Sequence, residues 1–188
     1  MPGAIDQLNI QFLPSFVPQP QATHVIFDFD GTLSWIRHGW PEIMQQVMSP
    51  RFPLKDGETK KNIREYLFEQ MYRFNGQPTP LFMAEMAKEI QSRSSEADPD
   101  EMFQSFLAVL NKGAHERHEN IRSKKCPPDD YIVFGGRAFI ETLIEAGLKV
   151  IILSGNPNDQ VDKEADLLDR SRYCDGHVYG HTDAENFS

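Results

Sequence analysis

The sequence predicts an α/β protein with a Rossmann-like parallel sheet core and an inserted α-helical cap. Short apolar runs rich in β-branched and aromatic residues occur at residues 24–29 (HVIFDF), 148–153 (LKVIIL) and 177–179 (HVY), and are typical of buried strands. Helical patterns separate these runs, and strands that alternate with helices form parallel sheets with right-handed crossovers. The helical pattern of residues 35–129 falls between the first two strands, so we expect it to form a separate cap over the strand ends.

Within the insert, apolar residues at helical spacing predict three helices. The first passes through residues 63–74, the second begins near residue 79, and the third begins at residue 99. Asp98 is the expected N-cap of the third helix, and Glu101 is expected to close a capping box.

Residues 137–146 and 159–168 are predicted helices of the core, and residues 154–157 (SGNP) a turn after the second strand. Residues 1–23 form a lead-in in which prolines forbid a long helix, and some of its apolar residues are expected to pack on the body. The predicted domains are therefore the lead-in (1–23), an α/β core (24–34 and 130–188) and a helical cap (35–129).

Composition excludes several classes of protein. A formal net charge of -9 argues against a general nucleic-acid or membrane-surface binder, which would need a basic face. Cys126 and Cys174 are too far apart in sequence for a disulfide framework or a paired-cysteine zinc signature. No apolar run approaches the ~18 residues of a membrane span, and the N-terminus is a poor signal peptide. We therefore expect a cytoplasmic protein with neither nucleic-acid nor membrane partners.

Two acidic residues directly after the first strand carry the strongest chemical signal. Asp28 and Asp30 are two residues apart, followed by Gly31 and Thr32, at the strand end where parallel sheets bind ligands. One carboxylate could attack phosphorus while the other protonates the leaving oxygen, with a divalent cation to offset charge repulsion. Amides of the turn at Gly31 could donate to phosphate. An ordinary acidic turn is the competing interpretation.

A second polar group follows the second strand. Ser154 and Gly155 offer a hydroxyl and turn amides to a phosphoryl group, and Asn156 could contact the substrate, although each could simply form a turn. Arg37 and His38 could touch substrate when the cap closes, but a hinge leading into a helix at Trp40 is the preferred interpretation. The string HERHE at residues 115–119 lacks the order of a metalloprotease motif and is expected to be a solvated helix face.

Residues 28–33 (DFDGTL) resemble the first motif of the haloacid dehalogenase (HAD) superfamily, Asp-x-Asp-x-Thr-Leu, and Ser154 resembles its second. The resemblance implies that Asp28 is the nucleophile, Asp30 the general acid/base, and Ser154 a phosphate ligand. It also implies Mg²⁺ bound by the Asp28 carboxylate and the Asp30 carbonyl. The second Asp favours the phosphatase and phosphomutase branches, and the insert matches the helical cap of phosphoglycolate phosphatase and β-phosphoglucomutase.

The sequence departs from this family near its end. The family has a Lys after the third strand and acidic residues after the fourth, whereas no Lys follows Lys163 here. We therefore expect a C-terminally truncated chain whose first strand is an exposed edge, covered in our hypothesis by the lead-in. Loss of a charge-stabilising group costs on the order of 10²–10³ in rate. The expected function is an Mg²⁺-dependent phosphatase acting on a small phosphorylated metabolite; the alternatives are a phosphomutase or a catalytically degenerate binding or regulatory module.

Overall fold

The computed structural model describes residues 13–17 and 21–181, and its described strands form one parallel sheet in the order β1-β2-β3. These strands are β1 (His24–Phe27), β2 (Lys149–Pro157) and β3 (Val178–His181). The predicted α/β class with a parallel sheet is confirmed. The predicted turn at residues 154–157 is wrong, because a register shift after Leu153 lets β2 continue until Pro157 pairs with His181.

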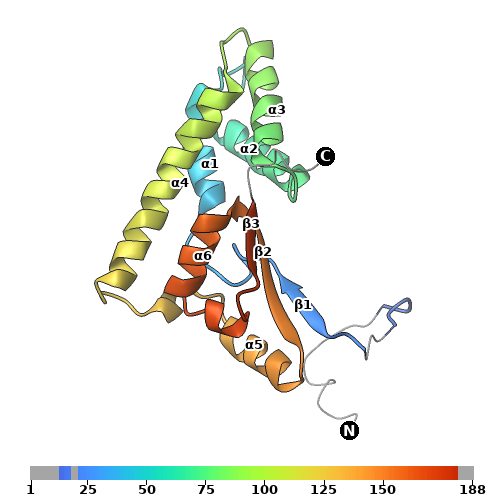
Figure 1. Cartoon of the computed structure of the whole chain (residues 1–188). Coiled ribbons are helices and arrows are strands. Elements are labelled where there is room, and N and C mark those ends of the chain that lie inside the picture. Colours follow the sequence, from blue (N-terminus) through green and yellow to red (C-terminus); the bar gives the residue numbers. More distant parts are fainter. Residues whose placement is uncertain (1–12, 18–20, 182–188) are drawn as a thin grey trace, which may run out of the picture.

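The described residues form six α-helices (Figure 1). They are α1 (Trp40–Met48), α2 (Lys60–Arg73), α3 (Thr79–Ser92), α4 (Pro99–Arg122), α5 (Gly136–Glu145) and α6 (Asn158–Leu167). Short 3₁₀ helices occupy Ser49–Arg51, Pro128–Tyr131 and Ser171–Tyr173. Figure 1 shows α1, α2, α3 and the first part of α4 gathered beyond the carboxyl ends of the strands.

The start of α4 confirms one capping prediction and corrects another. The Asp98 carboxylate accepts hydrogen bonds from the amides of Asp100 and Glu101, at 2.9 and 3.4 Å. The expected capping box is not formed, because the Glu101 carboxylate instead accepts hydrogen bonds from Arg51 at 2.6 and 2.8 Å. A charged partner from the 3₁₀ helix Ser49–Arg51 therefore takes the place of the local backbone amide at this carboxylate.

The sheet is covered by helices on one face. The crossovers through α5 and α6 advance in the same direction along the sheet, so right-handed connections place both helices on the same side. Alternate residues of β2 obey this arrangement, since Val150 and Ile152 are buried whereas Leu153 is 52% exposed. On β1, Ile26 is 64% exposed, and within the described residues β1 pairs only with β2. The expected edge position of β1 is thus observed in the described sheet.

The described part of the lead-in is solvent-facing. Leu13, Phe16 and Val17 are all more than half exposed, so the expectation that some apolar residues of the lead-in pack on the body stays a prediction. The remaining apolar residues of the lead-in lie outside the described residues. In the part of the chain that the structure describes, no helix is both long and apolar enough to cross a membrane.

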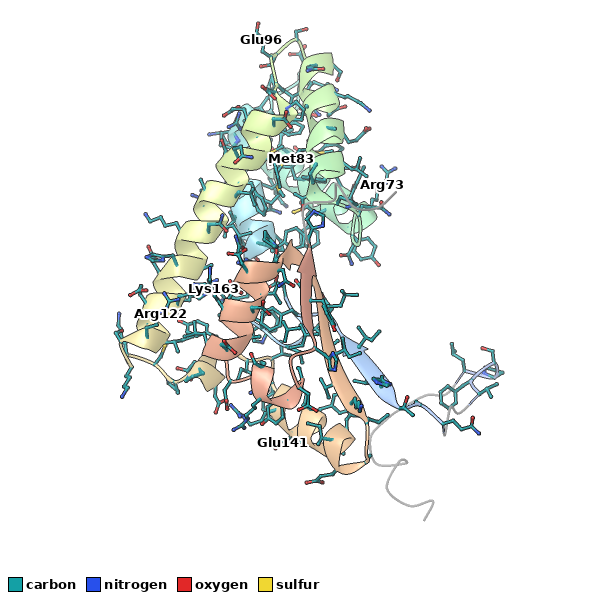
Figure 2. The ribbon with its side chains drawn as sticks, in the orientation of Figure 1. Arg73, Met83, Glu96, Arg122, Glu141 and Lys163 are labelled. Atoms are coloured by element: carbon teal, nitrogen blue, oxygen red, sulfur yellow. The ribbon has the colours of Figure 1, made fainter. Side chains whose placement is uncertain are left out.

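The buried hydrophobic residues of the described chain form two separate clusters. One lies among the helices of the cap, where Met83 is fully buried at its centre (Figure 2). The other lies between the sheet and the helices beside it and includes Phe29 and Ile152. Helix α4 joins both, because Phe106 belongs to the cap cluster and Ala114 to the core cluster. The cap and core therefore share one continuous helix, while the domain limits given above stay a prediction.

Candidate active site

The acidic loop after β1 is held in shape by Phe29. This side chain is fully buried, and its carbonyl oxygen accepts hydrogen bonds from the amides of Thr32, Leu33 and Ser34 at 3.3, 2.8 and 2.9 Å. Gly31 has a φ of +75°, a conformation that L residues with a side chain rarely adopt. Because Phe29 points into the core, the two neighbouring carboxylates point away from it: Asp28 is exposed, and Asp30 is partly buried.

Asp28 and Asp30 have different surroundings. Asp28 is exposed, and one of its carboxylate oxygens accepts a hydrogen bond from the Thr32 hydroxyl at 3.2 Å. Asp30 is partly buried; its Oδ2 accepts a hydrogen bond from the Asn156 side-chain amide. Its Oδ1 is buried without a hydrogen-bond donor among the described residues and lies 3.7 Å from Arg37 Nη1.

These surroundings raise the pKa of Asp30 above its usual 3.8. Burial is the largest cause, the Arg37 charge opposes it, and Glu164 reinforces it. A carboxyl group that retains its proton to higher pH is suited to act as a general acid. The two carboxylates therefore differ in burial and in hydrogen-bond partners.

A cleft of about 720 Å³ separates this loop from the cap. Five of the predicted site residues line it: Asp30, Gly31, Arg37, His38 and Asn156. The other four, Asp28, Thr32, Ser154 and Gly155, are not among the described residues that line this cleft.

Ser154 and Gly31 both make internal contacts. Ser154 is 8% exposed, and its hydroxyl oxygen accepts a hydrogen bond from the Asn156 amide at 3.2 Å. Ser154 thereby orients the residue that binds Asp30. The Gly31 amide, expected to be available to phosphate, donates instead to the Ser34 carbonyl at 2.8 Å.

Arg37 is held beside Asp30 by helix α6. Its guanidinium forms an ion pair with Glu164 and donates to Gln160 Oε1 at 3.2 Å. Glu164 is 2% exposed, and His118 Nε2 of α4 lies 3.3 Å from its other oxygen, at ion-pair distance without hydrogen-bond alignment. Burial acts to raise the pKa of Glu164, but the His118 ring and the Arg37 guanidinium outweigh it and hold that pKa below 4.5. Arg37 is therefore a fixed cation at the edge of the cleft.

His38 makes a local contact of the kind expected for a hinge. Its Nδ1 lies 2.6 Å from the Trp35 carbonyl oxygen, and its ring meets the Trp35 ring edge-on with centroids 6.0 Å apart. Helix α1 begins at Trp40, as predicted, directly after Gly39 in the left-handed conformation. The segment thus turns sharply from the core into the cap.

Comparison with known proteins identifies the fold. No protein-family model and no curated protein sequence matches the chain. A predicted phosphoglycolate phosphatase from Haemophilus somnus 129PT is similar in structure, with a TM-score of 0.52, 14% identity, and coverage of 88% of this chain and 65% of that one. This chain has the haloacid dehalogenase fold.

Two further solved structures are similar at lower scores. A HAD family hydrolase from Deinococcus radiodurans R1, with bound phosphate and sodium, has a TM-score of 0.49, 18% identity, and coverage of 86% of this chain and 59% of that one. A β-phosphoglucomutase candidate from Thermotoga maritima has a TM-score of 0.49, 14% identity, and coverage of 88% and 63%. The chain thus spans less than two thirds of the length of these HAD-fold structures.

Sequence reasoning missed Glu164 and His118, although a signal for each was present. Glu164 interrupts the inward stripe of α6, between Val161 and Ala165, which are 1% and 0% exposed. A charged residue at such a position requires a buried partner. His118 likewise lies on the inward side of α4, four residues after the buried Ala114.

The prediction that residues 115–119 form a solvated helix face is therefore wrong in part. Arg117 also faces inward, because it donates to the carbonyl oxygens of Ile36 and His38 at 2.5 and 3.2 Å. These contacts pin the segment between core and cap to the middle of α4.

The residue types at the acidic loop fit a magnesium ion. Among the described residues, no group of three or more His, Cys, Asp or Glu is arranged to hold a metal. Mg²⁺ nevertheless needs only one or two carboxylates when water and substrate phosphate complete its shell. The exposed Asp28 carboxylate and the Asp30 main-chain carbonyl would supply oxygen ligands of this kind. Lys163 does not point toward this acidic loop. It lies on the side of α6 that faces α4, where it pairs with Asp159 at 3.0 Å (Figure 2).

Proposed function

We propose that this protein is a phosphatase of the HAD fold that hydrolyses a small phosphorylated metabolite through an aspartyl-phosphate. The observation that carries the proposal is the contrast between two carboxylates two residues apart. Asp28 is exposed and oriented by the Thr32 hydroxyl, whereas burial raises the pKa of Asp30 at the wall of a cleft. Two neighbouring carboxylates in different environments can share a nucleophilic and an acid/base role.

In the proposed reaction, a carboxylate oxygen of Asp28 attacks phosphorus and the ester P–O bond breaks. Asp30 gives its proton to the leaving oxygen, and the resulting carboxylate then takes a proton from a water molecule that attacks the aspartyl-phosphate. Inorganic phosphate leaves and Asp28 is regenerated. Arg37, 3.7 Å from Asp30, supplies positive charge beside the transferring group, and Asn156 orients Asp30.

Magnesium is the cofactor that we propose for this site. When bound by the Asp28 carboxylate and the Asp30 carbonyl, it would offset the repulsion between the attacking carboxylate and the phosphate. Ser154, Gly155, Gly31 and Thr32 stay predictions as phosphate-binding residues, as does the cytoplasmic location.

The test is hydrolysis of 4-nitrophenyl phosphate by this chain with and without Mg²⁺. We expect Mg²⁺-dependent release of nitrophenol that Asp28→Asn abolishes, since the amide cannot act as a nucleophile. Asp56→Asn, which removes an exposed carboxylate of the cap, is the matched control and should retain the rate. Robust activity of the Asp28→Asn protein would refute the assignment of the nucleophile.

A binding or regulatory module is the second candidate, favoured because the described residues include no group of three or more His, Cys, Asp or Glu that could hold a metal. Such a module would bind phosphate esters without turning them over. Calorimetric binding of a sugar phosphate combined with no turnover, with or without Mg²⁺, would favour this candidate. A phosphomutase would be recognised by product analysis, because it returns the phosphoryl group to another hydroxyl of the sugar.

A further inference from the structure

The cleft beside Asp30 has two chemically different ends. Asp30, Arg37 and Asn156 form its polar end, next to the proposed site of chemistry. From there the cleft extends into the cap and reaches side chains of the cap's hydrophobic cluster, among them Met44 and Phe82. A solvent-connected cleft that ends on a hydrophobic cluster exposes an apolar wall which a ligand can cover.

Aromatic rings form the exposed part of this apolar wall. Trp35 and Trp40 are each 40% exposed, and Phe74 at the end of α2 is half-buried. Phe74 meets Phe82 edge-on, with ring centroids 5.9 Å apart. These three rings come from the segment entering the cap and from α2's end, so they border the cleft from two sides. Aromatic side chains left accessible in this way favour contact with another ring or an apolar chain.

We propose that this wall is a subsite for an aromatic or otherwise apolar organic group, so that the ligands of this cleft are phosphate esters of aromatic or apolar alcohols. This inference rests on the proposed function only in placing the phosphate group at the polar end of the cleft, beside Asp30. It deepens that proposal by naming the substrate class.

The deep part of the wall discriminates against a sugar. Met44, Phe82 and Phe106 offer no strong hydrogen-bond donor or acceptor from their side chains; since each is less than 5% exposed, the larger apolar contacts come from Trp35, Trp40 and Phe74. A sugar hydroxyl placed against them would lose its hydrogen bonds to water without replacement, which is costly. An apolar group in the same place gains free energy in proportion to the surface it removes from water. The volume of about 720 Å³ accommodates an organic group well beyond the phosphate itself.

The test compares two phosphonates that share a head group and resist hydrolysis, phenylphosphonate and methylphosphonate. The sequence contains two tryptophans, and both line this cleft, so intrinsic fluorescence reports directly on its occupancy. We expect phenylphosphonate to bind about tenfold more tightly, because a tenfold step in affinity corresponds to about 56 Å² of buried apolar surface, which is less than the area of a phenyl ring.

Variants assign the effect to the wall. Phe74→Ala should weaken phenylphosphonate about fivefold, from loss of ring contact, and leave methylphosphonate unchanged. Tyr72→Ala is the matched control, because Tyr72 lies on the same helix, is 80% exposed and does not line the cleft. Trp40→Ala should also weaken phenylphosphonate, with Trp35 remaining as the fluorescent reporter.

Each outcome has a defined meaning. Equal affinities for the two phosphonates, no binding of phenylphosphonate, or tight binding that Phe74→Ala and Trp40→Ala leave unaltered would overturn the subsite. Selective phenylphosphonate binding with no hydrolysis of 4-nitrophenyl phosphate would support the subsite and count against the phosphatase. Hydrolysis of 4-nitrophenyl phosphate with equal affinity for the two phosphonates would support the phosphatase and count against the subsite. The two proposals can therefore fail separately.

Discussion

Replacing Glu164 with Leu tests whether the buried ion pair beside the cleft is the contact that fixes Arg37. Glu164 and Arg37 have only 2% and 10% of their side chains exposed, so removing the carboxylate leaves a guanidinium in a site poor in water. Breaking one partner of a buried pair typically costs about 3–5 kcal/mol. Arg37 retains Gln160 at 3.2 Å and Asp30 at 3.7 Å, so we expect a loss near the lower limit, about 3 kcal/mol.

The assay is urea denaturation, with the thermal midpoint as a second measure. For a chain of this length, about 3 kcal/mol corresponds to a midpoint lower by about 6–12 °C. The matched control is Asp159→Leu on the same helix, where a carboxylate 69% exposed pairs with Lys163; this change should cost less than about 0.5 kcal/mol.

A double-mutant cycle isolates the pair. Arg37→Met combined with Glu164→Leu removes both charges, so it should recover much of the stability lost in Glu164→Leu alone. The Glu164 contribution is also pH-dependent: its pKa is held below 4.5 in the folded state, so the stabilisation is present above that pH and is lost as the pH falls. Two results would refute a dominant Arg37–Glu164 contact. One is a Glu164→Leu protein as stable as the parent; the other is a double variant no more stable than Glu164→Leu alone.

Three more outcomes are expected. In Arg37→Gln, the pKa of Asp30, already above 3.8, should rise further because the opposing cation is gone. Carboxylate NMR titration would detect the rise, and an unchanged or lower pKa of Asp30 would contradict the geometry. Gly180→Ala should destabilise the fold by about 2 kcal/mol in urea unfolding, because an added Cβ would lie 2.4 Å from Asn158 Cα; a neutral effect would mean that this backbone can yield. Asp98→Ala should lower stability by about 1 kcal/mol through loss of the α4 cap, and unchanged helix stability by hydrogen exchange would speak against it.

The sequence predicted those features that depend on local periodicity. The apolar runs placed all three described strands, and Asp98 and the apolar spacing placed the helices of the cap to within a few residues. The extension of β2 through residues 154–157 could not be predicted, because it depends on a register shift against β3 and not on the turn propensities of Gly and Pro.

At the candidate site, the sequence predicted several residues that the structure brings together, but not all of their partners. The contact of Asp30 with Asn156 joins residues far apart in the chain, and both were named because each follows a strand. Glu164 and His118 were missed, since the apolar stripe that each interrupts was interpreted by its hydrophobic members alone. A long-range ion pair has no spacing rule in one sequence, although an ionisable residue on an inward stripe indicates that one exists.

Helix α4 has a mechanical consequence. Its 24 residues contact the cap cluster near one end and Glu164, through His118, nearer the other. From His118 back to Asp98 the helix measures about 30 Å, so a tilt of only about 5° would swing its far tip by roughly 2.6 Å. One continuous helix thus connects the outer end of the cap to the Arg37–Glu164 pair, and a tilt about that pair would move the cap's outermost turn most and the guanidinium beside Asp30 least.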